Sequence, residues 1–230
     1  MHSHHGSRHA CQVAHRHHRH PARCRKKHAR HATRRHGAAQ RVLAPTPPPA
    51  APRATAPATV QPGPSLAEIL ATPCQGTELM PAPANLAVIR AATLCLVNQE
   101  RARNGEQPLR GDAALEAAAQ GHSAQMIEQD YFAHVSPGGE TPLERIQAAG
   151  YIPNPQAGYA IGENIAWGTL GLATPSAIVA AWIASPEHLA NILDASYQDS
   201  GIGIVAQAPS SLAGDQAGAM YTQTFGVIIN

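Results

Sequence analysis

The sequence predicts an α+β fold in which helices cover an antiparallel sheet, and three observations support this. Five segments between residues 85 and 193 start with helix-capping residues. Strands are predicted mostly after these helices, apart from one irregular segment at 158–168. Every Trp, Tyr and Phe lies between Tyr131 and Phe225, so the large aromatic side chains that can fill a core belong to the C-terminal part. Helices followed by antiparallel strands pack on one sheet.

Charge divides the chain into two unlike parts. Residues 1–41 hold 11 of the 17 Lys and Arg, 11 of the 14 His and no acidic residue. From Glu68 onward, fifteen acidic residues are set against five arginines, a net charge of −10. We expect a disordered basic arm over 1–43, a Pro/Ala-rich linker over 44–64 and one globular domain over 65–230, since the arm has few large apolar side chains to bury. These counts exclude a two-domain protein and a basic nucleic-acid-binding fold.

The first two helices of the domain are predicted from caps and apolar stripes. Asn85 is a candidate N-cap for a helix that runs to about Asn104, just before Gly105. Asp112 is a candidate N-cap for a helix from residue 113 to about residue 129. The first stripe consists of Leu86, Ile89, Ala92 and Leu96, and the second of Leu115, Ala119, His122 and Met126.

Three shorter helices and three strands complete the predicted domain. Thr141-Pro142-Leu143-Glu144 is a capping box with Pro at the first helical position, and Gly150 ends that helix. Thr174-Pro175 opens a helix through Ala184, and Ser185-Pro186 opens another through Leu193. The strands are predicted at 158–168, 201–207 and 220–228.

Cys74 and Cys95 are the only cysteines of the predicted domain. A lone pair on either side of a helix start indicates a disulfide, and disulfides persist in oxidising compartments. No stretch approaches the ~18 apolar residues that span a membrane, and no apolar segment typical of a signal peptide follows the basic start. We nevertheless expect an exported protein, extracellular or in the cell envelope, because the disulfide requires an oxidising compartment.

Five motifs in order carry a resemblance to a known family: Tyr131-Phe132-x-His134, Gly162-Glu163-Asn164-Ile165-Ala166, Trp182-x-x-Ser185-Pro186-x-His188-x-x-Asn191-Ile192-Leu193, Gly201-Ile202-Gly203 and Thr222-Gln223-x-Phe225-Gly226. Together they resemble the CAP superfamily (cysteine-rich secretory, antigen 5, pathogenesis-related 1), specifically its compact bacterial branch. The resemblance covers roughly Leu94 to Val227. It implies a three-layer α-β-α sandwich, secretion, and a shallow cleft in which two His and acidic residues can hold a divalent metal.

In the resemblance, His134, Glu163 and His188 match the positions of the family's cleft residues. Larger family members have a second cleft Glu, and here that position is Ser185. Glu187 replaces the usual glycine, and an acid in the first turn complements the helix dipole. Two imidazoles and one carboxylate are the ligand set of zinc sites that keep an open position, so Zn²⁺ is the most suitable metal. A purely structural role, in which these residues only join irregular segments by hydrogen bonds, is weighted equally with metal or ligand binding.

Two further groups of residues have a structural interpretation. His122 shares its stripe with Leu115, Ala119 and Met126, so we expect a core histidine rather than a ligand. The basic arm could bind Zn²⁺ through its histidines, or anionic polymers through its Lys and Arg. A solvated disordered arm is favoured, because composition alone has little functional specificity.

Three functions follow from these residues. The favoured one is a secreted, non-catalytic CAP-domain binding protein, with a lipid, a glycan or another envelope component as the class of ligand. The second is a metal-dependent hydrolase that uses His134, Glu163 and His188. The third is an interaction protein that acts through its basic arm. Binding is favoured over catalysis because Glu163 cannot be both a metal ligand and the general base, so no catalytic residue is assigned.

Overall fold

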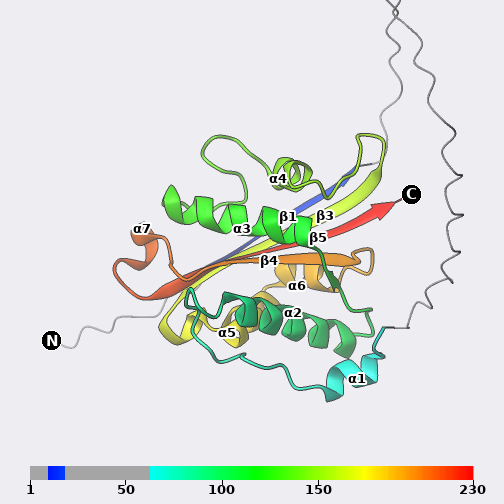
Figure 1. The fold of residues 1–230 in the computed structure, drawn as a ribbon, viewed down its shortest axis with the longest axis horizontal. Helices are drawn as coiled ribbons and strands as arrows, with labels where there is room; N and C mark the ends of the chain where they lie inside the picture. The colour runs from blue at the N-terminus through cyan, green and yellow to red at the C-terminus, as the bar shows by residue number, and fades with distance from the viewer. Residues whose placement is uncertain (1–9, 19–62, 230) are drawn as a thin grey trace, which may run out of the picture. The chain divides into compact units, whose positions relative to one another are not determined.

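The computed structural model describes residues 10–18 and 63–229, which form a sheet between two groups of helices (Figure 1). The elements in chain order are β1 (Ala10–His18), α1 (Leu66–Ala71), α2 (Leu86–Arg103), β2 (Arg110–Gly111), α3 (Ala113–Glu128), α4 (Pro142–Ala148), β3 (Gly158–Thr169), the 3₁₀ helix η1 (Leu170–Ala173), α5 (Pro175–Ala184), α6 (Pro186–Leu193), β4 (Asp199–Val205), α7 (Ser210–Ala213) and β5 (Gly218–Ile229).

The sheet has five strands in the order β1-β3-β5-β4-β2. β3 and β5 are its longest strands, with 12 residues each, and they pair antiparallel along their whole length. β4 pairs antiparallel with β5, and the two residues of β2 pair parallel with β4. The predicted α+β fold is confirmed, and β2 makes the predicted antiparallel sheet a mixed one.

Each face of the sheet carries its own apolar core. On one face, α2, α5 and α6 contribute Ile89, Trp182 and Ile192, which are fully buried. On the other face, Leu115 of α3 and Ile146 of α4 pack in a second cluster. Figure 1 shows α3 and α4 on one side of the sheet and α2 and α5 on the other. This is the predicted α-β-α sandwich.

The helices begin where their capping residues predict, although Asn85 and Ser185 do not cap through their side chains. Asp112 accepts hydrogen bonds from the backbone N–H groups of Ala114 and Leu115, both at 2.9 Å, and so caps α3. The capping box of Thr141 and Glu144 is present at α4. Asn85 precedes α2 without capping it, because its side chain accepts from the N–H of Ala82 at 2.8 Å instead.

The two long helices bury their stripes to different degrees. All four residues predicted for α3 are buried. In α2 the buried stripe is centred on Ile89, Thr93 and Val97, whereas Leu86 and Leu96 are only partly buried. The face of α2 is therefore rotated from the predicted one, because its contacts with α5 and β4 decide which residues face inward.

Glycines let α3 approach β4 closely. A Cβ on Gly201 would lie 2.1 Å from backbone atoms of Leu115 and Glu116, and a Cβ on Gly203 would lie 2.1 Å from the backbone of Ala119. Only glycine fits at such a distance. The Gly201-x-Gly203 motif therefore sets the spacing between α3 and the sheet.

The predicted disulfide is confirmed. Cys74 and Cys95 are bonded, with their Cα atoms 5.7 Å apart, and the bond ties the segment before α2 to that helix. In the part of the chain that the structure describes, no helix combines the length and apolar character that crossing a membrane requires.

Residues Ala10–His18 form strand β1, where the sequence predicts disorder. β1 pairs antiparallel with β3. Such pairing uses backbone groups and needs no large apolar side chains, which are what the arm lacks. The rest of the predicted arm and linker, residues 1–9 and 19–62, lies outside the described residues, and its character stays a prediction.

Candidate functional site

Glu163 lies near the middle of β3 and is fully buried. Successive side chains of a strand point to opposite faces of the sheet, so Glu163 and Asn164 lie on different sides. Glu163 points towards α3 and α4, where its carboxylate meets His134 and Arg145. Asn164 points towards α6, where its side-chain amide donates to the carbonyl of His188 at 3.2 Å.

Positively charged and polar groups surround the Glu163 carboxylate. Its Oε1 lies 2.8 Å from Nδ1 of His134, and Arg145 Nη2 donates to Oε1 and Oε2 at 3.3 and 3.1 Å. Nε2 of His122 lies 3.7 Å from Oε1, which is beyond hydrogen-bonding distance. We call these four residues, Glu163, His134, Arg145 and His122, the Glu163 network.

The Glu163 carboxyl group is ionised. Its complete burial raises the pKa, but the hydrogen bond with His134 and the positive charge of Arg145 outweigh this, so the pKa lies below the usual value. An ionised carboxylate only accepts hydrogen bonds, so Nδ1 of His134 donates to it. In the neutral imidazole the other nitrogen, Nε2, is then an acceptor.

Nε2 of His134 is buried and makes no hydrogen bond with any residue that the structure describes. The His134 side chain comes from the loop after α3 and is 12% exposed. Arg145 holds this loop, because its Nη2 also donates to the backbone carbonyl of His134 at 2.8 Å. The geometry therefore fixes the ring and leaves one lone pair for a ligand.

His122 is a core histidine, as predicted. It is completely buried on α3, and burial lowers its pKa to about 4, so the ring is neutral at pH 7. Nδ1 of His122 lies 3.4 Å from the hydroxyl of Tyr131, and that hydroxyl donates to Gln125 at 2.6 Å. Burial likewise raises the pKa of Tyr131 to about 12, so the phenol keeps its proton. His122 thus lies between Glu163 and the loop after α3, without a hydrogen bond to the carboxylate.

His188 is buried in the first turn of α6. Its Nδ1 lies 2.7 Å from the hydroxyl of Ser185. α6 is bound to β3 by Asn191, whose side-chain amide donates to the Glu163 carbonyl at 3.3 Å and to Asn164 at 2.8 Å. The structure thus brings His134 and Glu163 together, while α6 meets β3 at Asn164 and at the Glu163 backbone. The convergence of all three side chains on one pocket stays a prediction.

Some of these residues could bind the divalent metal that the family resemblance implies, and others could not. Within residues 63–229, no group of three or more His, Cys, Asp or Glu has the arrangement of a metal site. Glu163 does not fit as a ligand, because His134 and Arg145 occupy its oxygens and Arg145 would repel a cation. His134 does fit, because a metal-binding His usually donates its other ring N–H to a carboxylate, as His134 does to Glu163.

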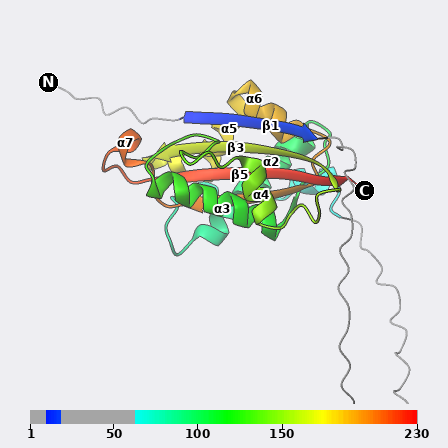
Figure 2. The same cartoon turned by 90° about the horizontal axis from the view of Figure 1, so that it is seen from above.

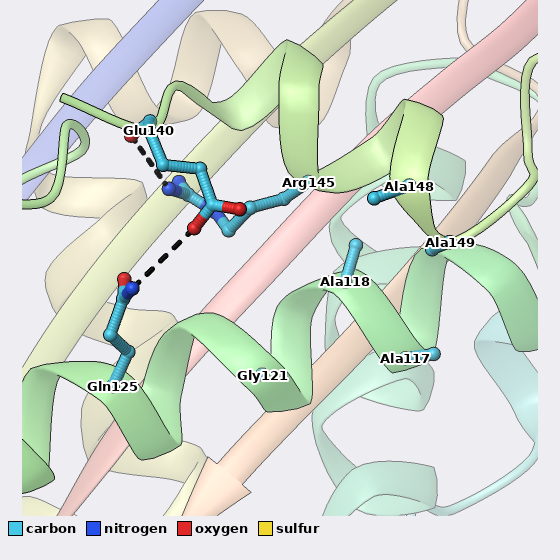
Figure 3. A pocket seen from close by; sticks show the side chains of 8 residues that line it. All are labelled: Ala117, Ala118, Gly121, Gln125, Glu140, Arg145, Ala148 and Ala149. Carbon is cyan, nitrogen blue, oxygen red and sulfur yellow. Dashed lines mark hydrogen bonds between the residues drawn. The ribbon is translucent and has the colours of Figure 1, made fainter. Parts of the chain in front are cut away.

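A groove of about 340 Å³ lies between α3 and α4, beside the network (Figure 3). At one end, Gln125 donates to the Glu140 carboxylate at 3.5 Å, and Arg145 Nη1 donates to the Glu140 backbone carbonyl at 3.2 Å. Arg145 therefore belongs both to the groove and to the Glu163 network. The lining residues are Ala117, Ala118, Gly121, Gln125, Glu140, Arg145, Ala148 and Ala149.

Sequence reasoning missed Arg145 and the contact between His122 and Glu163. Nothing in the sequence distinguishes Arg145 from an exposed arginine such as Arg103, because its burial depends on the packing of α4 against β3. A signal did exist for His122. A polar residue within an apolar stripe needs a buried partner, and Glu163 is the one acid set in an apolar run.

The part of the chain that carries these residues matches a known protein family. The family model described as the cysteine-rich secretory protein family, CAP, matches residues 94–224. The uncharacterised Bacillus subtilis (strain 168) protein YkwD is 31% identical over 144 residues, which cover 63% of this chain and 49% of YkwD. The uncharacterised membrane protein YlbC of the same strain is 32% identical over 111 residues, 48% of this chain and 30% of YlbC. The chain thus spans half or less of these relatives.

Two solved structures are similar as well. An extracellular protein containing an SCP domain from Bacillus anthracis str. Ames has a TM-score of 0.44 and 23% identity, over 63% of this chain and 43% of that one. An outer surface protein from Borrelia burgdorferi has a TM-score of 0.48 and 18% identity, over 64% of this chain and 95% of that one. Because the family model matches more than half of the residues, this chain belongs to the cysteine-rich secretory protein (CAP) family.

Proposed function

We propose that this chain is a secreted CAP-domain binding protein in which His134, oriented by Glu163, presents its Nε2 to a divalent metal or a small ligand. The observation that carries the proposal is the Glu163–His134 pair. A buried, ionised carboxylate fixes the ring through Nδ1, and Nε2 has no hydrogen-bonding partner among the described residues. Secretion is supported by the disulfide between Cys74 and Cys95.

His134 supplies one ligand, and His188 is the second imidazole that the family resemblance assigns to the same cleft. Zn²⁺ suits such nitrogen ligands and, when bound, would act as a Lewis acid towards an oxygen atom of the ligand. A lipid, a glycan or another envelope component remains the class of binding partner that we propose.

The hydrolase alternative is supported less well, because it needs a carboxylate that is free to activate water. Glu163 is fully buried, and both of its oxygens accept hydrogen bonds from Arg145. Larger family members have a second Glu in the cleft, but the residue at that position in this chain is Ser185, which has no carboxylate. The Glu163 carboxylate therefore orients His134 and stabilises the loop.

Titration calorimetry with Zn²⁺ on the full chain tests the proposal. The His134→Ala variant should lose one Zn²⁺-binding site, while any Zn²⁺ binding by the histidine-rich arm should remain. The Glu163→Gln variant should bind that ion about 10- to 100-fold more weakly, because the carboxylate orients the ligating ring. The Glu187→Gln variant removes an exposed charge from α6 and should bind as the unchanged protein does. Identical binding by the His134→Ala variant would leave the network a purely structural role.

A further inference from the structure

The outer edge of β3 is paired with a segment of the basic arm. β3 pairs with β5 on one side along all 12 of its residues, and with β1 on the other side from Tyr159 to Trp167. Figure 2 shows β1 running alongside β3 at the margin of the sheet. Without β1, the backbone groups on this side of β3 would have no strand partner.

The sequence of β3 does not protect this edge. Exposed edge strands in soluble proteins are usually short, or carry Lys, Pro or bulges that prevent pairing with other chains. β3 has 12 residues and no Lys, Arg or Pro. Its single charged residue, Glu163, is buried and bound by Arg145, so it cannot protect the edge. At the opposite margin of the sheet, β2 has only two residues, and such a short edge strand resists pairing with other chains. The β3 edge is therefore suited to receive a strand.

The basic arm has the reach and the charge to supply that strand. The 44 residues between His18 and Gly63 could span more than about 100 Å if extended, so reaching β3 imposes no strain. The arm has 11 Lys and Arg among residues 1–41 and no acid, whereas the domain carries a net charge of −10. Opposite charges raise the local concentration of the arm at the domain. Strand pairing itself uses backbone groups, so it does not require an apolar arm.

We propose that the outer edge of β3 is an acceptor site for an extended basic peptide, and that residues Ala10–His18 of the same chain occupy it. β1 also contacts α6, the helix that carries His188. Release of β1 therefore uncovers both the β3 edge and one side of α6. The arm acts as a built-in occupant that another extended segment can replace.

Amide hydrogen exchange on the full chain tests whether residues Ala10–His18 occupy the β3 edge. Successive N–H groups of a paired strand point to opposite sides, so a double variant, Val13→Pro with Ala14→Pro, removes the bonding N–H whichever residue carries it. Exchange should become faster in β3 between Tyr159 and Trp167, while β4 and α3 stay protected. Equal exchange of β3 in both proteins would overturn the proposal. The matched control, Ala38→Pro with Ala39→Pro, places the same change outside β1 and should leave β3 protected.

A peptide added to the double-proline variant tests the acceptor site. A synthetic peptide of residues Arg8–His20 should restore protection of β3, and less so at high salt, where charge attraction is screened. The same peptide with both prolines should not. Failure of the unmodified peptide to restore protection would overturn the acceptor site. A dimeric unchanged protein that becomes monomeric in the variant would instead show a strand donated by a second copy, against the intramolecular occupant.

Discussion

Nη2 of Arg145 lies 3.1 Å from Oε2 of Glu163, and both side chains are buried. The same nitrogen donates to the backbone carbonyl of His134, and Nη1 donates to that of Glu140. One guanidinium thus joins α4, the loop after α3 and β3. This arrangement explains how an irregular loop can hold an imidazole at a fixed position.

Loss of this guanidinium should destabilise the domain strongly. The Arg145→Met variant leaves the Glu163 charge buried without its cation, which costs about 3–5 kcal/mol. Urea unfolding should report this loss. Adding Glu163→Leu to Arg145→Met should recover much of it, because no buried charge then remains. Arg103 pairs with Glu100 at 3.1 Å but is 54% exposed, so the Arg103→Met control should cost less than about 1 kcal/mol. Equal losses for Arg145→Met and Arg103→Met would contradict the assignment.

Stability should fall as the pH drops from about 6.5 to about 4, partly because of His122. Burial lowers the pKa of His122 to about 4 in the folded protein, while an unfolded chain has the ordinary value of about 6.5. Between these values the unfolded state binds the extra proton, so the stabilisation is present above pH 6.5 and is lost as the pH falls through 4. The full loss is about 3 kcal/mol.

A comparison of variants isolates this contribution. The His122→Gln variant should show a shallower fall of unfolding free energy over the same pH interval, measured by urea unfolding with a chelator present. The arm carries 11 histidines, but they are the same in both proteins and cancel in the comparison. Parallel pH profiles for the two proteins would show that His122 does not titrate in this way.

The disulfide should stabilise the folded domain by restricting the unfolded chain. Cys74 and Cys95 are 21 residues apart in sequence, and closing a loop of that length is worth about 3 kcal/mol in the chain-entropy model. The double variant Cys74→Ser with Cys95→Ser should lose about this amount in thermal or urea unfolding. Cys24→Ser removes a thiol outside the pair and should leave the unfolding free energy unchanged.

The close approach of α3 and β4 should make Gly203 intolerant of any side chain. In the Gly203→Ala variant the new Cβ would meet the backbone of Ala119, and such overpacking costs about 1–3 kcal/mol or more. Gly121 on the same helix is a matched control, because a Cβ there meets nothing within 4 Å. Gly121→Ala should stabilise α3 by about 0.5–1 kcal/mol. The midpoint of urea unfolding should therefore fall in the Gly203→Ala variant and rise in the Gly121→Ala variant.

The sequence by itself determined the local elements and the pairing of Cys74 with Cys95. Asp112 and Thr141 cap helices because their side chains bond to backbone groups two or three residues away, and such contacts depend on the local sequence. The strand at 158–168 was predicted almost to its ends, although its edges are irregular in sequence. The order of the five family motifs predicted the α-β-α arrangement.

Only the tertiary structure decided which side chains meet Glu163 and which strand lies beside β3. Arg145 reaches Glu163 because α4 packs against β3, and the sequence around Arg145 has no pattern that marks its burial. β1 formed where composition predicted disorder, because the unpaired edge of β3 supplies the backbone partners that the arm lacks by itself. Both relationships join segments far apart in the chain. Their energy comes from desolvation and from partners that exist only after the domain has folded.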